Sequence, residues 1–233
     1  MGGGGFSMEP DNPLLDDFVL GLSRRHPARV CFVPTASADS PTYIVRFYRR
    51  FAHRCVATDL TLWNPQPLPR QPSRTSELAA FVAEQDVIYV GGGDTANLLV
   101  LWRRHGLDVI LRDAWSQGAV LAGVSAGMLC WFTGGVTDSF GGLEPLCDGL
   151  GLIDATACPH YDGEPGRRPA YHRAIAAGMK AGFAADDGAA LHFRRATFVE
   201  AISSRPEARA YRVELTSNGV AETPLPTRFL GST

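Results

Sequence analysis

A serine between two glycines follows an apolar run near the middle of the chain. The run at residues 119–122 leads into Gly123-Val124-Ser125-Ala126-Gly127, and a helix-like stretch follows. This order is the arrangement of a nucleophile elbow: a strand, then a glycine turn that carries a serine, then a helix. The glycines permit a turn with positive φ and leave space around the hydroxyl. Free N–H groups at the start of the next helix point to where an oxyanion is held in acyl transfer.

The pentapeptide alone is also common as a tight turn between a strand and a helix. Its context favours a nucleophile, because an apolar strand precedes it and a helix follows it. A second glycine turn, Gly91-Gly92-Gly93, follows the strand-like run at residues 87–90 and could supply a further backbone N–H. These features together predict that Ser125 is the nucleophile of an acyl-transfer reaction.

A serine hydroxyl needs a base within hydrogen-bond reach, and histidine is the usual one. His160 follows the strand-like run at residues 155–158, and active-site residues of α/β proteins gather at strand ends. We predict that His160 is the base, with a capping histidine in a loop as the alternative. The other histidines lie in surface segments, in helices or inside a strand (His26, His53, His105, His172 and His192).

Two aspartates are candidates for the acid that orients the imidazole. Asp138 lies in a glycine-rich segment, residues 133–142, which we expect to be a loop after the elbow helix. Asp187 lies in a turn after the strand-like residues 183–185. Asp162 is too near His160 in sequence to orient its far nitrogen comfortably. Aspartate is also common in turns of no function, so these patterns leave the acid open.

The order of the elements predicts the fold class. Strand-like and helix-like segments alternate through the first two thirds of the chain, and alternating strands near the C-terminus suggest hairpins. We predict one α/β domain over residues 1–233, with a three-layer, mostly parallel, doubly wound sheet and antiparallel edge strands near the C-terminus. The proline-rich residues 64–73 are expected to form a surface loop.

Met1 leads directly into Gly2-Gly3-Gly4-Gly5, and a glycine cluster of this kind normally closes a strand. Two interpretations have equal weight. Either a first strand is missing ahead of these glycines, or the glycines are a disordered leader. The pattern of a signal peptide does not occur.

Composition excludes several classes of function. The 22 basic residues are scattered among 24 acidic ones, which argues against a nucleic-acid partner. No apolar run is long enough for a membrane span. Five cysteines without a C-x-x-C pair fit a reducing cytoplasm and offer no cysteine zinc site. We expect a cytoplasmic monomer or homodimer that needs no metal or organic cofactor.

Several stretches resemble one family in order and spacing: GGGDTANLL at 91–99, GVSAGM at 123–128, TDSFG at 137–141 and CPHYD at 158–162. The chain resembles the aspartyl dipeptidase (peptidase E) family of serine peptidases, which is related to the cyanophycinases. The resemblance implies a fold similar to class I glutamine amidotransferases, with serine in place of their cysteine. It assigns the nucleophile to Ser125, the base to His160 and the oxyanion hole to the N–H groups of Gly93 and Ala126.

The resemblance leaves the acid between Asp138 and Asp187 and slightly favours Asp187. Peptidase E has a glutamate there, so the shorter aspartate puts the reach to His160 in question. The family holds a substrate aspartate with basic residues after the histidine, which here correspond to Arg167, Arg168 or Arg173. The expected function is hydrolysis of short peptides, as by a dipeptidase or other exopeptidase. An esterase, an amidase on isopeptide-type substrates, and a non-catalytic binding or regulatory protein are the alternatives.

Overall fold

The structure is a computed structural model that describes residues 1–63 and 75–231. The loop expected at residues 64–73 lies outside these residues. The N-terminal half is a four-stranded parallel sheet in the order β2-β1-β3-β4. Its strands are β1 (Arg29–Val33), β2 (Val56–Asp59), β3 (Val87–Val90) and β4 (Val120–Gly123).

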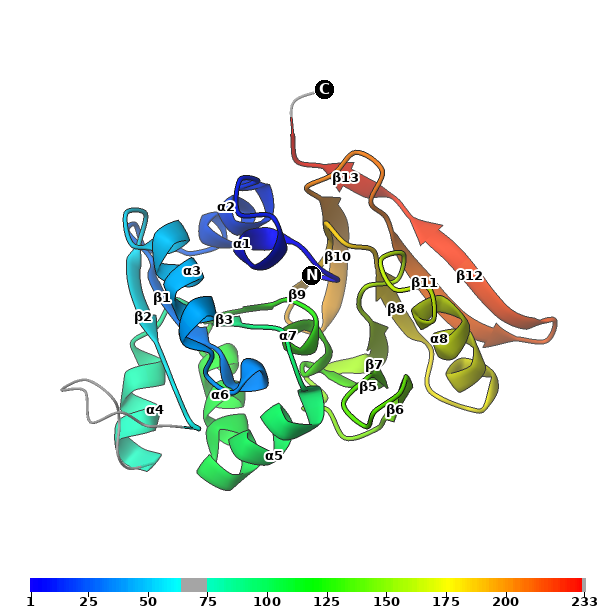
Figure 1. The fold of residues 1–233 in the computed structure, drawn as a ribbon, viewed down its shortest axis with the longest axis horizontal. Coiled ribbons are helices and arrows are strands. Elements are labelled where there is room, and N and C mark those ends of the chain that lie inside the picture. The colour runs from blue at the N-terminus through cyan, green and yellow to red at the C-terminus, as the bar shows by residue number, and fades with distance from the viewer. Residues whose placement is uncertain (64–74, 232–233) are drawn as a thin grey trace.

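Helices cover both faces of this sheet (Figure 1). Side chains alternate along β3, so Ile88 and Val90 enter one apolar cluster while Val87 and Tyr89 enter the other. The first cluster includes residues of α4 (Thr75–Ala83), α5 (Thr95–His105) and α6 (Leu107–Ser116). The second includes residues of α1 (Gly5–Met8), α2 (Leu14–Gly21) and α3 (Pro41–Phe51). Burial on both faces explains why these strands are continuously apolar in sequence.

The C-terminal half contains two further sheets. The six-stranded sheet has the order β12-β11-β8-β7-β5-β6 and packs against α8 (Arg167–Ala176). Its strands are β5 (Phe132–Thr137), β6 (Glu144–Leu146), β7 (Ile153–Cys158), β8 (Gly182–Ala185), β11 (Ala210–Thr216) and β12 (Gly219–Leu225). The three-stranded sheet, β13-β10-β9, consists of β9 (Ala189–Arg194), β10 (Thr197–Ser203) and β13 (Thr227–Phe229). Antiparallel pairs join β8 to β11, β11 to β12 and β9 to β10, which confirms the predicted antiparallel strands near the C-terminus.

Some local predictions were wrong. Residues 133–137, expected to be part of a loop, form most of β5, because Gly134 and Gly135 are sites of close backbone approach. A Cβ on either glycine would overlap the carbonyl oxygen of Leu146 or Ala157 in the neighbouring strands. The strand-like run expected at residues 155–158 belongs to β7, which begins two residues earlier at Ile153.

The N-terminal glycines run between the two halves of the molecule (Figure 1). The amino group of Met1 donates to the Gly123 carbonyl at 2.9 Å, and the Ser125 N–H donates to the Met1 carbonyl at 3.1 Å. On the other side, the Gly188 N–H donates to the Gly3 carbonyl at 3.0 Å. This segment therefore connects the end of β4 to the turn between β8 and β9.

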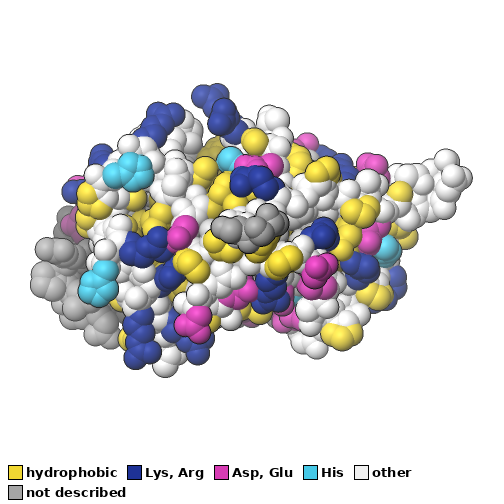
Figure 2. Space-filling model, turned by 90° about the horizontal axis from the view of Figure 1, so that it is seen from above, with side chains coloured by type: hydrophobic (Ala, Val, Ile, Leu, Met, Phe, Trp, Pro, Cys, Tyr) yellow, Lys and Arg dark blue, Asp and Glu magenta, His cyan; other side chains and the backbone are white. Residues whose placement is uncertain are grey.

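Charged side chains of both signs are interspersed over the face shown in Figure 2, with apolar side chains between them. In the parts of the chain that the structure describes, no helix is both long and apolar enough to cross a membrane.

Candidate active site

Ser125 occupies a strained turn between β4 and the short helix α7 (Ala126–Leu129). Its φ of 57° and ψ of −115° lie where a residue with a side chain is rarely found. Steric contacts explain why both residues that flank this turn are glycine. A Cβ on Gly123 would overlap the carbonyl of Gly127, and a Cβ on Gly127 would overlap the carbonyl of Val90. The spacing of the motif thus permits a turn that leaves Ser125 half-buried while its neighbours are buried.

The second glycine turn lies directly against the serine. A Cβ built on Gly92 would be 3.2 Å from the Cβ of Ser125. The Gly92 N–H donates to the Tyr43 hydroxyl at 3.2 Å, so this N–H already has an acceptor. Gly93 has a φ of 135°, and a Cβ there would overlap the Ala36 carbonyl. Ala126 is the first residue of α7, where backbone N–H groups have no acceptor within the helix.

His160 and Asp187 meet across the ends of neighbouring strands. His160 follows β7, Asp187 lies in the turn between β8 and β9, and their Nδ1 and Oδ1 atoms are 2.7 Å apart. Their side chains are only 13% and 14% exposed. The hydrogen bond from His160 lowers the pKa of Asp187 below its usual value, which outweighs the opposite effect of burial. The aspartate therefore reaches the imidazole despite being shorter than a glutamate.

Three residues that sequence reasoning did not assign to the site hold Asp187 in place. The Asp187 N–H donates to Oδ1 of Asp162 at 2.8 Å. A Cβ on Gly3 or Gly163 would overlap the Asp187 carboxylate, so both glycines leave space for it. The position of Asp162 in the CPHYD stretch was the available signal, whereas Gly3 comes from a segment distant in sequence.

Asp138, the other candidate acid, has a different partner. Its side chain is 62% exposed and lies 3.5 Å from Nη2 of Arg167. Arg167 is 3% exposed and also donates to Glu164 at 2.6 Å and to the Val136 carbonyl at 3.1 Å. The structure therefore places Asp187 beside His160, while Asp138 lies beside Arg167. Arg167 is held by Asp138, Glu164 and the Val136 carbonyl.

Arg168 lies beside the histidine turn. Its guanidinium carbon is 4.6 Å from the ring centre of Tyr161 and 5.1 Å from that of Tyr211. It is 44% exposed and 3.7 Å from Oε1 of Glu222. Arg173 lies exposed on α8, in the last turn of the helix.

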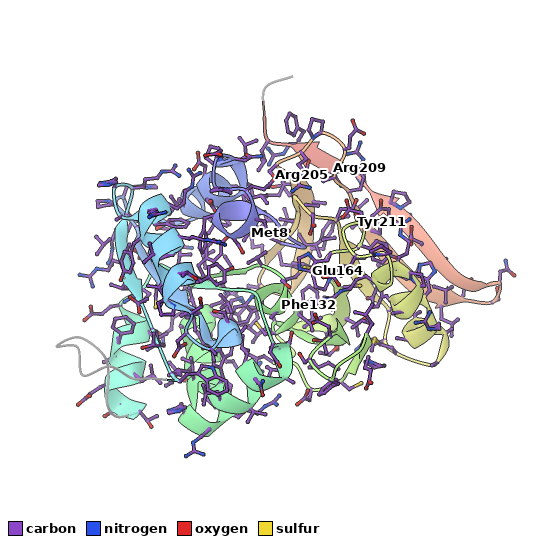
Figure 3. All side chains as sticks on the ribbon, in the orientation of Figure 1. Met8, Phe132, Glu164, Arg205, Arg209 and Tyr211 are labelled. Carbon is purple, nitrogen blue, oxygen red and sulfur yellow. The ribbon has the colours of Figure 1, made fainter. Side chains whose placement is uncertain are left out.

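Figure 3 shows Met8, Glu164 and Arg205, from three separate segments, near the middle of the molecule where the two halves meet. Nε of Arg205 donates to Glu9 at 2.7 Å, and its side chain lies against Gly188, next to Asp187. The charge of Arg205 helps to lower the pKa of Asp187. Residues 1–63 and 75–231 contain no group of three or more His, Cys, Asp or Glu side chains arranged to hold a metal ion.

Comparison with known proteins shows the family of this chain. Residues 1–200 match the model of peptidase family S51. The uncharacterized peptidase YgaJ of Bacillus subtilis is 54% identical over 99% of this chain and 97% of its own length. Peptidase E of Streptomyces coelicolor is 32% identical over 60% of this chain and 54% of its own length.

Solved structures agree with this fold. A peptidase from an acI-B1 Actinobacterium superposes with a TM-score of 0.71 at 17% identity, over 97% of this chain and 93% of that one. A putative peptidase E from Listeria monocytogenes gives a TM-score of 0.56 at 18% identity, over 90% of this chain and 92% of that one. The α/β architecture predicted from the sequence is thereby confirmed, and the chain belongs to peptidase family S51, a family of serine peptidases.

Proposed function

We propose that this peptidase hydrolyses short peptides from one end through an acyl-enzyme formed on Ser125. The observation that carries the proposal is the 2.7 Å hydrogen bond between His160 Nδ1 and Asp187 Oδ1 in a chain with a serine elbow. That bond commits Nδ1 to the carboxylate, so Nε2 is the nitrogen that exchanges a proton with the serine.

The chemistry has two stages. The hydroxyl oxygen of Ser125 attacks the scissile carbonyl carbon while its proton passes to His160 Nε2. His160 then protonates the leaving amine, and the carbon–nitrogen bond breaks to leave an ester on Ser125. In the second stage His160 takes a proton from water, the resulting hydroxide attacks the ester, and the serine leaves with that proton.

The backbone at Gly93 and Ala126 supplies the oxyanion hole in this proposal. Both residues adjoin Ser125, because Gly92 packs against the serine and Ala126 follows it in the chain. N–H groups aimed at the developing oxyanion stabilise the transition state without reorganising during the reaction.

Arg168 is our candidate for binding a substrate carboxylate. It is partly exposed, is held between two tyrosine rings and lies next to the turn that carries His160. The resemblance to the aspartyl dipeptidase (peptidase E) family makes an acidic first residue the preference to test. Arg167 is an unsuitable candidate because its guanidinium is buried among other partners.

A peptide panel tests the proposal. Asp-Leu, Leu-Leu, Arg-Leu and N-blocked Asp-Leu should be incubated with the wild type and with Ser125→Ala. We expect cleavage of Asp-Leu that is lost in the variant, and a rise in KM of at least about tenfold in Arg168→Ala but not in Arg173→Ala. Cleavage of every unblocked peptide equally would refute the carboxylate specificity, and failure to cleave any peptide would refute the peptidase mechanism.

A further inference from the structure

The hydroxyl of Tyr43, a residue of α3, lies between the second glycine turn and helix α1. It accepts a hydrogen bond from the Gly92 N–H at 3.2 Å and donates its own proton to Oγ of Ser7 at 2.7 Å. Burial raises the pKa of Tyr43, so the hydroxyl keeps the proton that it gives to Ser7. Since a phenol has one proton, its oxygen acts only as an acceptor toward Gly92. These two bonds connect three segments that are distant in sequence.

The ring of Tyr43 is held on several sides. Its centre is 5.5 Å from the ring centre of Phe6 and 5.0 Å from that of Phe32, and both phenylalanines are buried. A Cβ built on Gly91 would be 2.9 Å from Cε1 of the Tyr43 ring, so the glycine turn itself packs against the tyrosine. Because these contacts fix the ring, they also fix the position of the hydroxyl that meets Gly92.

Gly92 lies against both this hydroxyl and the nucleophile. A Cβ built on Gly92 would be 3.2 Å from Cβ of Ser125 and 3.7 Å from its Oγ. The turn is held again on the other side of Gly92. There a Cβ on Gly93 would overlap the Ala36 carbonyl, and the Asp94 N–H donates to that carbonyl at 2.8 Å. The peptide group that carries the Gly93 N–H therefore lies between two anchored positions.

Three consecutive glycines need such anchors. Without a Cβ, the backbone of a glycine has access to more conformations than that of any other residue. An oxyanion hole is effective when its N–H groups already point to the place where negative charge develops, because they then need no reorganisation during the reaction. Contacts from outside the turn must set that direction here, and the bond from Gly92 to Tyr43 is such a contact.

We propose that Tyr43 is a positioning residue of the oxyanion hole, whose hydroxyl holds Gly92 and thereby directs the Gly93 N–H at the oxyanion. This role rests on the acyl-enzyme mechanism proposed above. Tyr43 acts through the glycine turn and exchanges no proton with the substrate. Ser7 supports it by accepting the Tyr43 proton, so the N-terminal segment contributes to the site through α1 as well as through Gly3.

The test compares Tyr43→Phe with Tyr48→Phe. Both residues lie on α3 and each variant loses one hydroxyl, but the Tyr48 hydroxyl donates to Oδ1 of Asp59 at 2.7 Å and makes no hydrogen bond to the glycine turn. The rate of Ser125 labelling by a fluorophosphonate is measured in each. As the serine oxygen attacks phosphorus and fluoride leaves, negative charge develops on the phosphoryl oxygen in the oxyanion hole. Labelling should be at least about tenfold slower in Tyr43→Phe and within about twofold of the wild type in Tyr48→Phe.

Two further readouts separate positioning from a general loss of stability. The pH at which labelling is half-maximal should be the same in Tyr43→Phe as in the wild type, because the hydroxyl takes no part in proton transfer. Amide hydrogen exchange at Gly92 should become at least about tenfold faster in Tyr43→Phe and should not change in Tyr48→Phe. The double variant Tyr43→Phe/Ser7→Ala should be labelled no more slowly than Tyr43→Phe alone, since both residues act through one hydrogen bond.

Equal labelling rates in Tyr43→Phe and Tyr48→Phe, whether both fast or both slow, would overturn the proposal. A shifted pH profile in Tyr43→Phe would also overturn it, because the hydroxyl would then take part in proton transfer. An unlabelled wild type would instead refute the proposed function, whereas unchanged Gly92 exchange in Tyr43→Phe would refute the anchor alone. If Tyr43→Phe failed to fold, Ser7→Ala, which removes only the acceptor of the Tyr43 proton, should slow labelling by about threefold. Unchanged labelling in that variant would contradict the proposal.

Discussion

His160 Nδ1 and Asp187 Oδ1 lie 2.7 Å apart. The backbone of each residue also makes a hydrogen bond, because the His160 carbonyl accepts from the Glu164 N–H and the Asp187 N–H donates to Asp162. His160 has a φ of 53°, and Ser125 likewise has a φ of 57°. Positive φ values in residues with side chains cost energy and persist where the surroundings determine them. The two residues proposed for proton transfer are thus both held in backbone conformations that the fold imposes.

Asp187→Asn should lower kcat by about 10²- to 10⁴-fold, because an amide can stabilise the wrong tautomer of His160 and does not stabilise the imidazolium. Asp138→Asn should leave kcat within about twofold, since Asp138 pairs with Arg167. Steady-state kinetics on the best peptide of the panel measure both. Equal losses in the two variants would remove Asp187 from its proposed role.

We expect Asp162 to support catalysis by holding Asp187 in position. In Asp162→Ala the Asp187 N–H loses its acceptor, and we expect kcat to fall by about tenfold with little change in KM. Asp162→Asn retains an oxygen acceptor and should recover most of the activity. A general loss of folding in both variants, seen as equal falls in Tm, would assign Asp162 a purely structural role.

Gly93→Ala should destabilise the fold by at least about 2 kcal/mol, because the new Cβ overlaps the Ala36 carbonyl and φ is 135°. Gly21→Ala is the matched control, since the added Cβ has no heavy atom within 4 Å. The free energy of unfolding, measured by urea denaturation, should be lower for Gly93→Ala than for Gly21→Ala. A Gly93→Ala protein as stable as the control would show that this turn is not constrained as the structure indicates.

The sequence allowed the fold class and the serine elbow to be predicted because both depend on local patterns. Apolar runs of four or five residues set the strands, and the glycines around Ser125 mark a turn.

Other features depend on contacts distant in sequence. Gly134 and Gly135 suggested a loop, but they lie in β5 where adjacent backbones approach closely. The local turn pattern did not decide between Asp138 and Asp187, because only the pairing of β7 with β8 sets Asp187 beside His160. The role of Gly3 in giving space to the Asp187 carboxylate needed the three-dimensional arrangement.

The most direct measurement is covalent labelling of the intact protein with a fluorophosphonate, followed by mass spectrometry of its peptides. The account predicts one adduct per chain on Ser125, strongly slowed labelling in His160→Ala, none in Ser125→Ala and unchanged labelling in the exposed-serine control Ser116→Ala. An adduct on another residue, or no adduct on folded wild-type protein, would contradict a nucleophilic Ser125.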